Sequence, residues 1–155
     1  MQNWCLTVAR LVLTFWVGAA TLFVVVVVRV NHFMELDSIM RGQLIVIRFP
    51  AYYAFGFSCV ITGLVTTIAA SNHAAVSRRR MVIAAAFTAV ALATMVADYA
   101  FIYSPLYEMV VSADALPSSF RSYHEASKYV NLFDVGLCLV AAVMLCHSRR
   151  AGDAG

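Results

Sequence analysis

Two aspartates lie inside stretches of the sequence that are otherwise apolar, and they are the first candidates for chemistry. Asp98 follows directly after the uncharged stretch Met81–Ala97, and Asp134 lies within Tyr129–Cys146. A carboxylate in an apolar environment is costly unless a partner neutralises it. Two carboxylates close together there also repel, so we expect that Asp98 and Asp134 are not both freely ionised. Arg48 is the predicted partner, because its long stem can reach inward from the start of another apolar stretch.

Polar side chains recur along the last apolar stretch at the spacing of one helix face. His124, Ser127, Asn131, Asp134 and Cys138 are separated by 3, 4, 3 and 4 residues. This spacing places all of them on one stripe of a helix. Antiparallel packing would bring polar side chains of neighbouring helices to the same level and form a polar pocket that opens to the outer face. The candidate residues of this pocket are Arg48, Tyr52, Asp98, His124, Ser127, Asn131 and Asp134.

Four interpretations of this cluster are open. In the first it is structural, and arginines or tyrosine hydroxyls pair with the aspartates and hold the helices together. In the second it binds a small polar or amphipathic molecule, and in the third it holds a metal ion or a haem. The metal ligands would be His32, Glu35 and His124, since a zinc site needs three or four such donors. In the fourth, paired carboxylates conduct protons or ions.

Sequence motifs of soluble enzymes are absent from the chain. It contains no G-x-S-x-G, no P-loop and no G-x-G-x-x-G. Cys5, Cys59, Cys138 and Cys146 form neither C-x-x-C nor C-x-x-C-H, which argues against a disulfide framework and a covalent haem. We therefore predict a non-catalytic module that binds a small molecule or an ion, or an accessory subunit, with no cofactor. The alternative is a haem- or metal-dependent membrane redox enzyme.

Four apolar stretches must position these residues. Hydrophobic residues make up 63% of the 155 residues and charged residues 12%. An apolar helix of about 20 residues spans the hydrocarbon core of a bilayer, which is about 30 Å thick. The sequence therefore predicts one integral membrane domain over residues 1–147, with spans near 9–28, 50–70, 81–103 and 123–146. Residues 148–155 are predicted to form a disordered cytoplasmic tail.

Small and hydroxylated residues recur along the spans, as close packing between membrane helices requires. They predict an all-α, antiparallel, left-handed four-helix bundle in the membrane. We expect Pro50 to start the second span and Pro105 to end the third. The first outer loop, 29–43, mixes apolar and charged residues and predicts a short amphipathic helix at the interface. The expected packing residues are Thr14, Gly18 and Thr21 in the first span, Tyr52, Gly56, Cys59, Gly63, Thr66 and Ala70 in the second, and Ala84, Thr88, Ala91, Met95 and Asp98 in the third.

Basic residues that flank the spans predict the orientation and the partners. Arg78, Arg79 and Arg80 stand in one short loop, and such residues favour the cytoplasmic side. We predict cytoplasmic N- and C-termini and a location in the plasma (inner) membrane. The chain has no basic helix face with interleaved aromatic residues, so we expect no nucleic-acid partner. The expected partners are the lipid bilayer, a small-molecule or ion ligand, and a second copy of the chain or another membrane protein.

Three short motifs resemble a known family. They are Phe15-Trp16-Val17-Gly18 in the first span, Arg48-Phe49-Pro50 with Tyr52 and Tyr53 at the second, and His124-x-x-Ser127-x-x-x-Asn131-Leu132 at the fourth. Together they resemble the four-helix family of transmembrane protein 205, over most of the chain from Arg10 to Cys146. The resemblance implies a four-span bundle with an unassigned molecular activity, and it gives the polar stripe more functional weight.

The layout also looks like that of the copper-resistance-D-like membrane proteins and of the haem-containing protoporphyrinogen oxidases. Those proteins carry histidines inside the first span and at the third. The corresponding stretches here read Arg10-Leu11-Val12-Leu13 and Met81-Val82-Ile83-Ala84, without histidine. His32 and His124 are then the histidines left as axial haem ligands.

Overall fold

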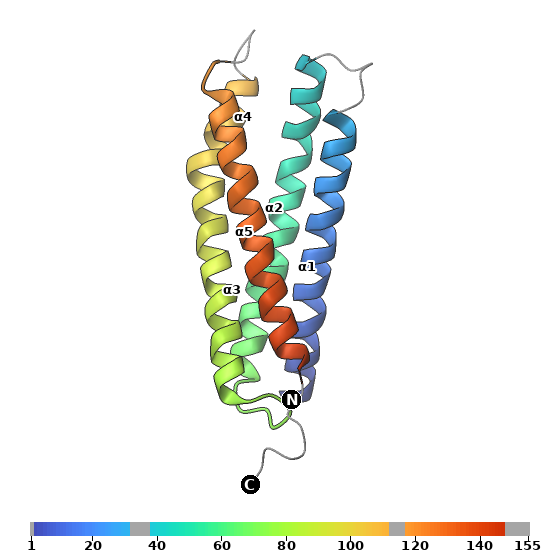
Figure 1. Cartoon of the computed structure of the whole chain (residues 1–155), viewed down its shortest axis with the longest axis vertical. Coiled ribbons are helices and arrows are strands. Elements are labelled where there is room, and N and C mark those ends of the chain that lie inside the picture. Colours follow the sequence, from blue (N-terminus) through green and yellow to red (C-terminus); the bar gives the residue numbers. More distant parts are fainter. Residues whose placement is uncertain (1, 32–37, 112–116, 148–155) are drawn as a thin grey trace.

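The described part of the chain folds into four long helical rods that stand side by side (Figure 1). The computed structural model describes residues 2–31, 38–111 and 117–147. Its elements are α1 (Gln2–Asn31), α2 (Ser38–Ala69), α3 (Arg78–Asp98), the π-helical segment η1 (Tyr99–Tyr103), α4 (Ser104–Val111) and α5 (Phe120–Cys146). The third rod consists of α3, η1 and α4 without a break. The prediction of an all-α four-helix bundle is confirmed.

Successive rods run in opposite directions (Figure 1). The start of α1 and the end of α5 therefore lie at the same end of the bundle, which we name the terminal end. The opposite end, where α1 ends and α5 begins, is the distal end. This antiparallel arrangement brings Asp98, at the end of α3, to the level of the first half of α5.

All four rods are long and apolar enough to cross a bilayer. The stretches are Gln2–Val30, Ile47–Ala69, Arg78–Val111 and Phe120–Cys146, and an 18-residue window in each has a mean hydropathy of 2.6, 1.5, 2.0 and 2.0, respectively. Large apolar side chains such as Phe15, Phe101 and Leu132 lie on the outside of the bundle. An apolar outer surface is what lipid requires of a spanning helix. By length and composition, the chain is a multi-pass membrane protein.

The packing residues of α1 differ from the predicted ones. Thr14, Gly18 and Thr21 are exposed. Each threonine hydroxyl donates to the carbonyl four residues earlier in α1, so these side chains need no polar partner on another helix. The buried face of α1, spaced by three and four residues, consists of Leu6, Ala9, Leu13, Trp16 and Ala20.

Close approach between α1 and α2 comes from glycines of α2. A Cβ atom at Gly56 would lie 2.5 Å from Cη2 of Trp16, and one at Gly63 would lie 2.8 Å from Cδ2 of Leu13. Large side chains of α1 therefore fill the space that two glycines of α2 leave open. The indole of Trp16 also packs on the ring of Tyr52, with 4.9 Å between the ring centres.

The predicted packing residues of the second and third spans are confirmed with one exception. In α2, Thr66 is half-buried, and its neighbour Thr67 is buried in its place. The confirmed residues are Tyr52, Gly56, Cys59, Gly63 and Ala70 in α2, and Ala84, Thr88, Ala91, Met95 and Asp98 in α3.

Pro50 and Pro105 lie inside helical rods, so the predictions that Pro50 starts a span and Pro105 ends one are wrong. Pro50 belongs to α2, because this helix continues beyond the apolar stretch to Ser38. Pro105 is the second residue of α4 and lacks an amide hydrogen. The π-helical segment directly before it already departs from α-helical bonding, which lets the rod continue.

The predicted amphipathic helix of the first outer loop is not a separate element in the described part of the chain. Residues 29–31 end α1, and residues 38–43 begin α2. Both helices extend past the apolar stretches, so the residues predicted at the two ends of this loop belong to α1 and α2. Residues 32–37 lie outside the described residues, as does the predicted disordered tail, 148–155.

Hydrogen bonds from arginines close the bundle at the terminal end. Nε of Arg10 donates to the carbonyl oxygen of Leu145 at 2.8 Å, and Arg80 donates to that of His147 at 3.4 Å. These carbonyls lie at the C-terminus of α5, where helical carbonyls lack partners within the helix. The two arginines therefore join α5 to α1 and α3 at this end.

Candidate functional site: a buried aspartate behind a distal cavity

Asp98 accepts hydrogen bonds from three neutral donors on two helices, α2 and α5. Its Oδ2 atom accepts from the hydroxyl of Tyr53 at 2.5 Å, from Nδ2 of Asn131 at 2.9 Å and from the hydroxyl of Ser127 at 3.2 Å. The side chain is 1% exposed, and its Oδ1 atom has no hydrogen-bond partner in the described part of the chain. Neutral donors from α2 and α5 thus stabilise the buried carboxylate of Asp98, which an ion pair was expected to do.

Arg48 was the predicted partner of the aspartates, and this prediction is wrong. Within residues 2–31, 38–111 and 117–147, no ion pair or hydrogen bond joins Arg48 to Asp98 or Asp134. Arg48 lies in α2 one turn before Tyr52 and is half-buried. Tyr53, and not Arg48, binds Asp98. Its side chain points to α3, whereas the preceding residue, Tyr52, points to α1.

Asp134 belongs to a second polar contact, deeper in the bundle. The hydroxyl of Thr94, one turn before Asp98 on α3, donates to Oδ1 of Asp134. Asp134 is 2% exposed, and its Oδ2 atom has no hydrogen-bond partner among the described residues. The two aspartates therefore mark two successive levels of the contact between α3 and α5.

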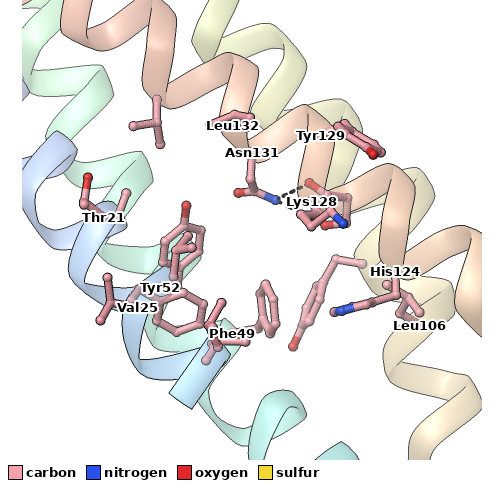
Figure 2. Close-up of a pocket in the computed structure, with 18 of the residues that line it drawn as sticks. Thr21, Val25, Phe49, Tyr52, Leu106, His124, Lys128, Tyr129, Asn131 and Leu132 are labelled. Atoms are coloured by element: carbon pink, nitrogen blue, oxygen red, sulfur yellow. Dashed lines mark hydrogen bonds between the residues drawn. The ribbon is translucent and has the colours of Figure 1, made fainter. Parts of the chain in front are cut away.

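Asn131 links the buried aspartate to a cavity. Its Nδ2 atom donates to Oδ2 of Asp98 and to the carbonyl oxygen of Ser127, both at 2.9 Å. Asn131 also lines the cavity, and Figure 2 shows its amide nitrogen turned toward α5 and its oxygen on the cavity side. At this point the cavity wall therefore presents the amide oxygen of Asn131. The hydrogen bond to Asp98 behind it determines how the amide is oriented.

The cavity lies between the distal parts of α1 and α5 and has a volume of about 470 Å³. The valine-rich end of α1 forms one wall and the first half of α5 forms the facing wall, with α2, η1 and α4 at the back (Figure 2). Most of the lining side chains are apolar. The polar ones are Thr21, Tyr52, Tyr103, Tyr107, His124, Ser127, Lys128, Tyr129 and Asn131.

An aromatic cluster forms the back of the cavity. The ring centre of Tyr52 lies 4.5 Å from that of Phe23, and the ring of Phe49 lies 5.5 Å from that of Tyr103. The ring of Tyr103 in turn lies 5.0 Å from that of Tyr53, which holds Asp98. Such pairs stabilise the packing of aromatic side chains beyond the area that they bury. The cluster gives the cavity a back wall of packed aromatic rings.

The predicted pocket residues divide into three groups. Tyr52, His124, Ser127 and Asn131 line the cavity. Asp98 lies directly behind Ser127 and Asn131 and does not line it. Arg48 and Asp134 belong to neither wall.

Sequence reasoning missed two residues that hold the aspartates, Tyr53 and Thr94. Thr94 carries a usable signal, since a hydroxyl one turn before an acid on the same helix can reach the same neighbouring helix. Tyr53 is harder to find, because it lies beside the small-residue face of α2 and not on it. Its role follows from the rotation of α2 relative to α3.

The predicted metal ligands are placed only in part. His124 lines the cavity, whereas His32 and Glu35 lie outside the described residues. Within the described ranges, no three histidine, cysteine, aspartate or glutamate side chains gather as a metal site would require. The ring of His124 stacks on Phe120, with 6.0 Å between the ring centres.

Comparisons of the chain with protein-family models, with curated proteins and with solved structures find no match. The function must therefore be inferred from the geometry of the cavity and of the polar groups behind it.

Proposed function

We propose that this membrane protein is a non-catalytic binding module that holds a small amphipathic molecule in the distal cavity. The cavity of about 470 Å³ carries this proposal. Its volume falls in the range of about 300–1,000 Å³ that small-molecule sites occupy, and its walls are mostly apolar with a few polar groups. An apolar tail fits the valine-rich wall, and a polar head fits the wall with Asn131 and Tyr52.

The ligand enters sideways from the bilayer. Val24, Val28 and Leu132 line the cavity and are also 54%, 49% and 69% exposed on the outside of the bundle. In a membrane, these exposed apolar side chains at the cavity opening face lipid tails. A molecule dissolved in the bilayer therefore reaches the cavity between α1 and α5 without crossing water.

We assign the cavity to the outer half of the membrane. Arg10 and Arg29 lie about 28 Å apart along α1, close to the thickness of the hydrocarbon core of about 30 Å. The cavity residues of α1, from Ala20 to Val28, belong to the half nearer Arg29. The terminal end carries Arg78–Arg80, which favours the cytoplasmic side. The termini are then cytoplasmic, and the location proposed is the plasma membrane.

Membership of the family of transmembrane protein 205 is part of the same proposal. The fourth-span motif that carries the resemblance consists of His124, Ser127, Asn131 and Leu132, and all four side chains line the cavity. A shared cavity wall gives these residues a common reason to be present. The proposal predicts that relatives with this motif bind similar molecules.

Filling the cavity should abolish binding. Val25 lines the cavity, and its neighbour Val26 is exposed without lining it. We expect Val25→Trp to reduce photo-crosslinking to cavity peptides at least about tenfold, the effect of about 1.4 kcal/mol of binding free energy. The probes are C16 chains with a mid-chain diazirine and an alcohol, carboxylate or trimethylammonium head, and the protein is the full chain in lipid nanodiscs. Val26→Trp is the matched control and should label like the unmodified protein. Equal labelling of both variants with every probe would contradict the proposed site.

The proposed orientation is tested by cysteine labelling in intact cells. Ala74 and Glu108 are exposed at the terminal and distal ends. In a variant without the four native cysteines, Glu108→Cys should react with a membrane-impermeant maleimide, and Ala74→Cys should react only after the cells are permeabilised. The reverse pattern would show that the bundle is inverted and that the cavity faces the inner leaflet.

A further inference from the structure

We infer that the ligand of the distal cavity carries a neutral hydroxyl head, as in a long-chain alcohol or a phenol with an apolar tail. This inference rests on the proposed binding function and adds the chemical class of the ligand. It follows from the hydrogen-bonding groups that the cavity wall offers.

The amide of Asn131 presents an acceptor to the cavity. Both N–H groups of its Nδ2 atom are directed away from the cavity, one to Asp98 and one to the backbone carbonyl of Ser127. If the amide were flipped, its oxygen would face the oxygens of these two acceptors without a hydrogen between them. The buried aspartate therefore determines that Asn131 accepts a hydrogen bond from a ligand.

Two tyrosine residues of the same cavity lining carry hydroxyls that can donate to a ligand. Tyr103 is 6% exposed, and its buried hydroxyl has no hydrogen-bond partner in the described part of the chain. Tyr52 lines the same cavity on the side that faces Asn131 (Figure 2), and none of its hydrogen bonds involves another described residue. A buried hydroxyl without a hydrogen-bond partner is costly, so a ligand that supplies this partner binds more tightly.

A cavity lining with one acceptor and two donors matches a ligand group that both donates and accepts a hydrogen bond. A ligand hydroxyl donates to Oδ1 of Asn131 and accepts from Tyr52 or Tyr103. A carboxylate has no hydrogen to donate, and it would face the Asn131 oxygen with Asp98 behind it. A quaternary ammonium group has neither a donor nor an acceptor, and the acid that would attract it lies behind Ser127 and Asn131.

Among the described residues, Lys128 is the one lysine or arginine that lines the cavity, and it lies toward the rim. Lys128 is exposed, and its ammonium lies 5.1 Å from the ring centre of Tyr129, which is itself 63% exposed. Lys128 opposes a cationic ligand there and offers an anionic lipid a contact at the surface. An anionic head would then stay at Lys128 and leave the hydroxyls of Tyr52 and Tyr103 unpaired.

The three C16 probes test the class of the ligand, because they share one tail and differ in the head. We expect the alcohol to label cavity peptides of the full-length protein about tenfold more than the carboxylate or the trimethylammonium probe, because only the alcohol can donate to Asn131 and accept from a tyrosine hydroxyl at the same time. Preference for the carboxylate probe, lost in Lys128→Met, would show an anionic ligand held at the rim and overturn the inference. Preference for the ammonium probe, or equal labelling by all three, would overturn it as well. These outcomes leave the binding function intact, whereas no labelling by any probe would contradict both.

Removal of the tyrosine hydroxyls separates recognition from folding. Tyr52→Phe and Tyr103→Phe remove hydroxyls that make no hydrogen bond to a described residue, so both variants should fold. We expect the double variant to lose about three- to tenfold in labelling by the alcohol probe. Tyr123→Phe, on α5 but outside the cavity lining, is the matched control and should label normally. Unchanged alcohol labelling in the double variant would overturn the inference.

Discussion

Replacement of Asp98 by leucine should lower the free energy of unfolding by about 3 kcal/mol or more, because two buried donors and one half-buried donor lose their acceptor and each lost hydrogen bond costs about 1–3 kcal/mol. The donors are the hydroxyls of Tyr53 and Ser127 and the amide of Asn131. In the apolar interior of the bundle, water cannot replace the lost acceptor. Thermal unfolding in detergent measures the effect.

Two control variants identify the cause. Asp98→Asn keeps an oxygen where Oδ2 accepts its three hydrogen bonds, so we expect a loss of about 1 kcal/mol, the strength of a typical hydrogen bond. Arg48→Leu should have a still smaller effect, because Arg48 makes no ion pair or hydrogen bond to a described aspartate. If Arg48→Leu were as damaging as Asp98→Leu, an ion pair and not the neutral donors would hold Asp98.

A double variant tests whether Tyr53 and Asp98 act as a pair. When both partners of a buried hydrogen bond become apolar, the desolvation penalty of the remaining partner disappears. Tyr53→Phe combined with Asp98→Leu should therefore cost less than the sum of the two single changes. Additive effects would show that the hydroxyl of Tyr53 does not depend on Asp98.

The sequence predicts the helices of this fold because each apolar stretch has the length of a bilayer and each polar residue must find a protected position. The polar stripes on α3 and α5 follow from this reasoning. The α3 stripe from Ala84 to Asp98 is buried, as are Ser127, Asp134 and Cys138 of the α5 stripe, whereas Asn131 is half-buried. The face of α1 does not follow from it. Thr14 and Gly18 look like packing residues, but a close contact needs a small residue on only one of two helices, and Gly56 and Gly63 of α2 supply it.

The candidate site is predictable at the level of its polar stripe and not at the level of its contacts. The spacing of Ser127 and Asn131 predicts that they face the interior, and both reach Asp98. The sequence predicts a charged partner, Arg48, because opposite charges are the simplest way to stabilise a buried acid. The structure uses neutral donors, and this choice depends on the rotation of α2 that brings Tyr53 to the acid. Rotation is set by packing and leaves no spacing pattern of its own.

The second large effect concerns the glycine beneath Trp16. A Cβ atom at Gly56 would lie 2.4 Å from Cε of Met95 and 2.5 and 2.8 Å from Cη2 and Cζ3 of Trp16. Met95 can move its flexible end, but the indole is rigid, 1% exposed and enclosed by the core. Gly56→Ala should therefore force α1 and α2 apart and lower the free energy of unfolding by about 1–3 kcal/mol, as overpacking of a core does.

The matched controls are two other helical glycines. A Cβ atom at Gly18 or Gly136 would meet nothing within 4 Å. Gly18→Ala and Gly136→Ala should be neutral or stabilise the protein by up to about 1 kcal/mol, because alanine loses less backbone freedom in a helix. Trp16→Phe removes the ring atoms that a new Cβ would meet, so it should recover part of the loss in the Gly56→Ala background. If Gly56→Ala were as harmless as the controls, the indole of Trp16 would not lie against this glycine, and α1 would not pack on α2 as described.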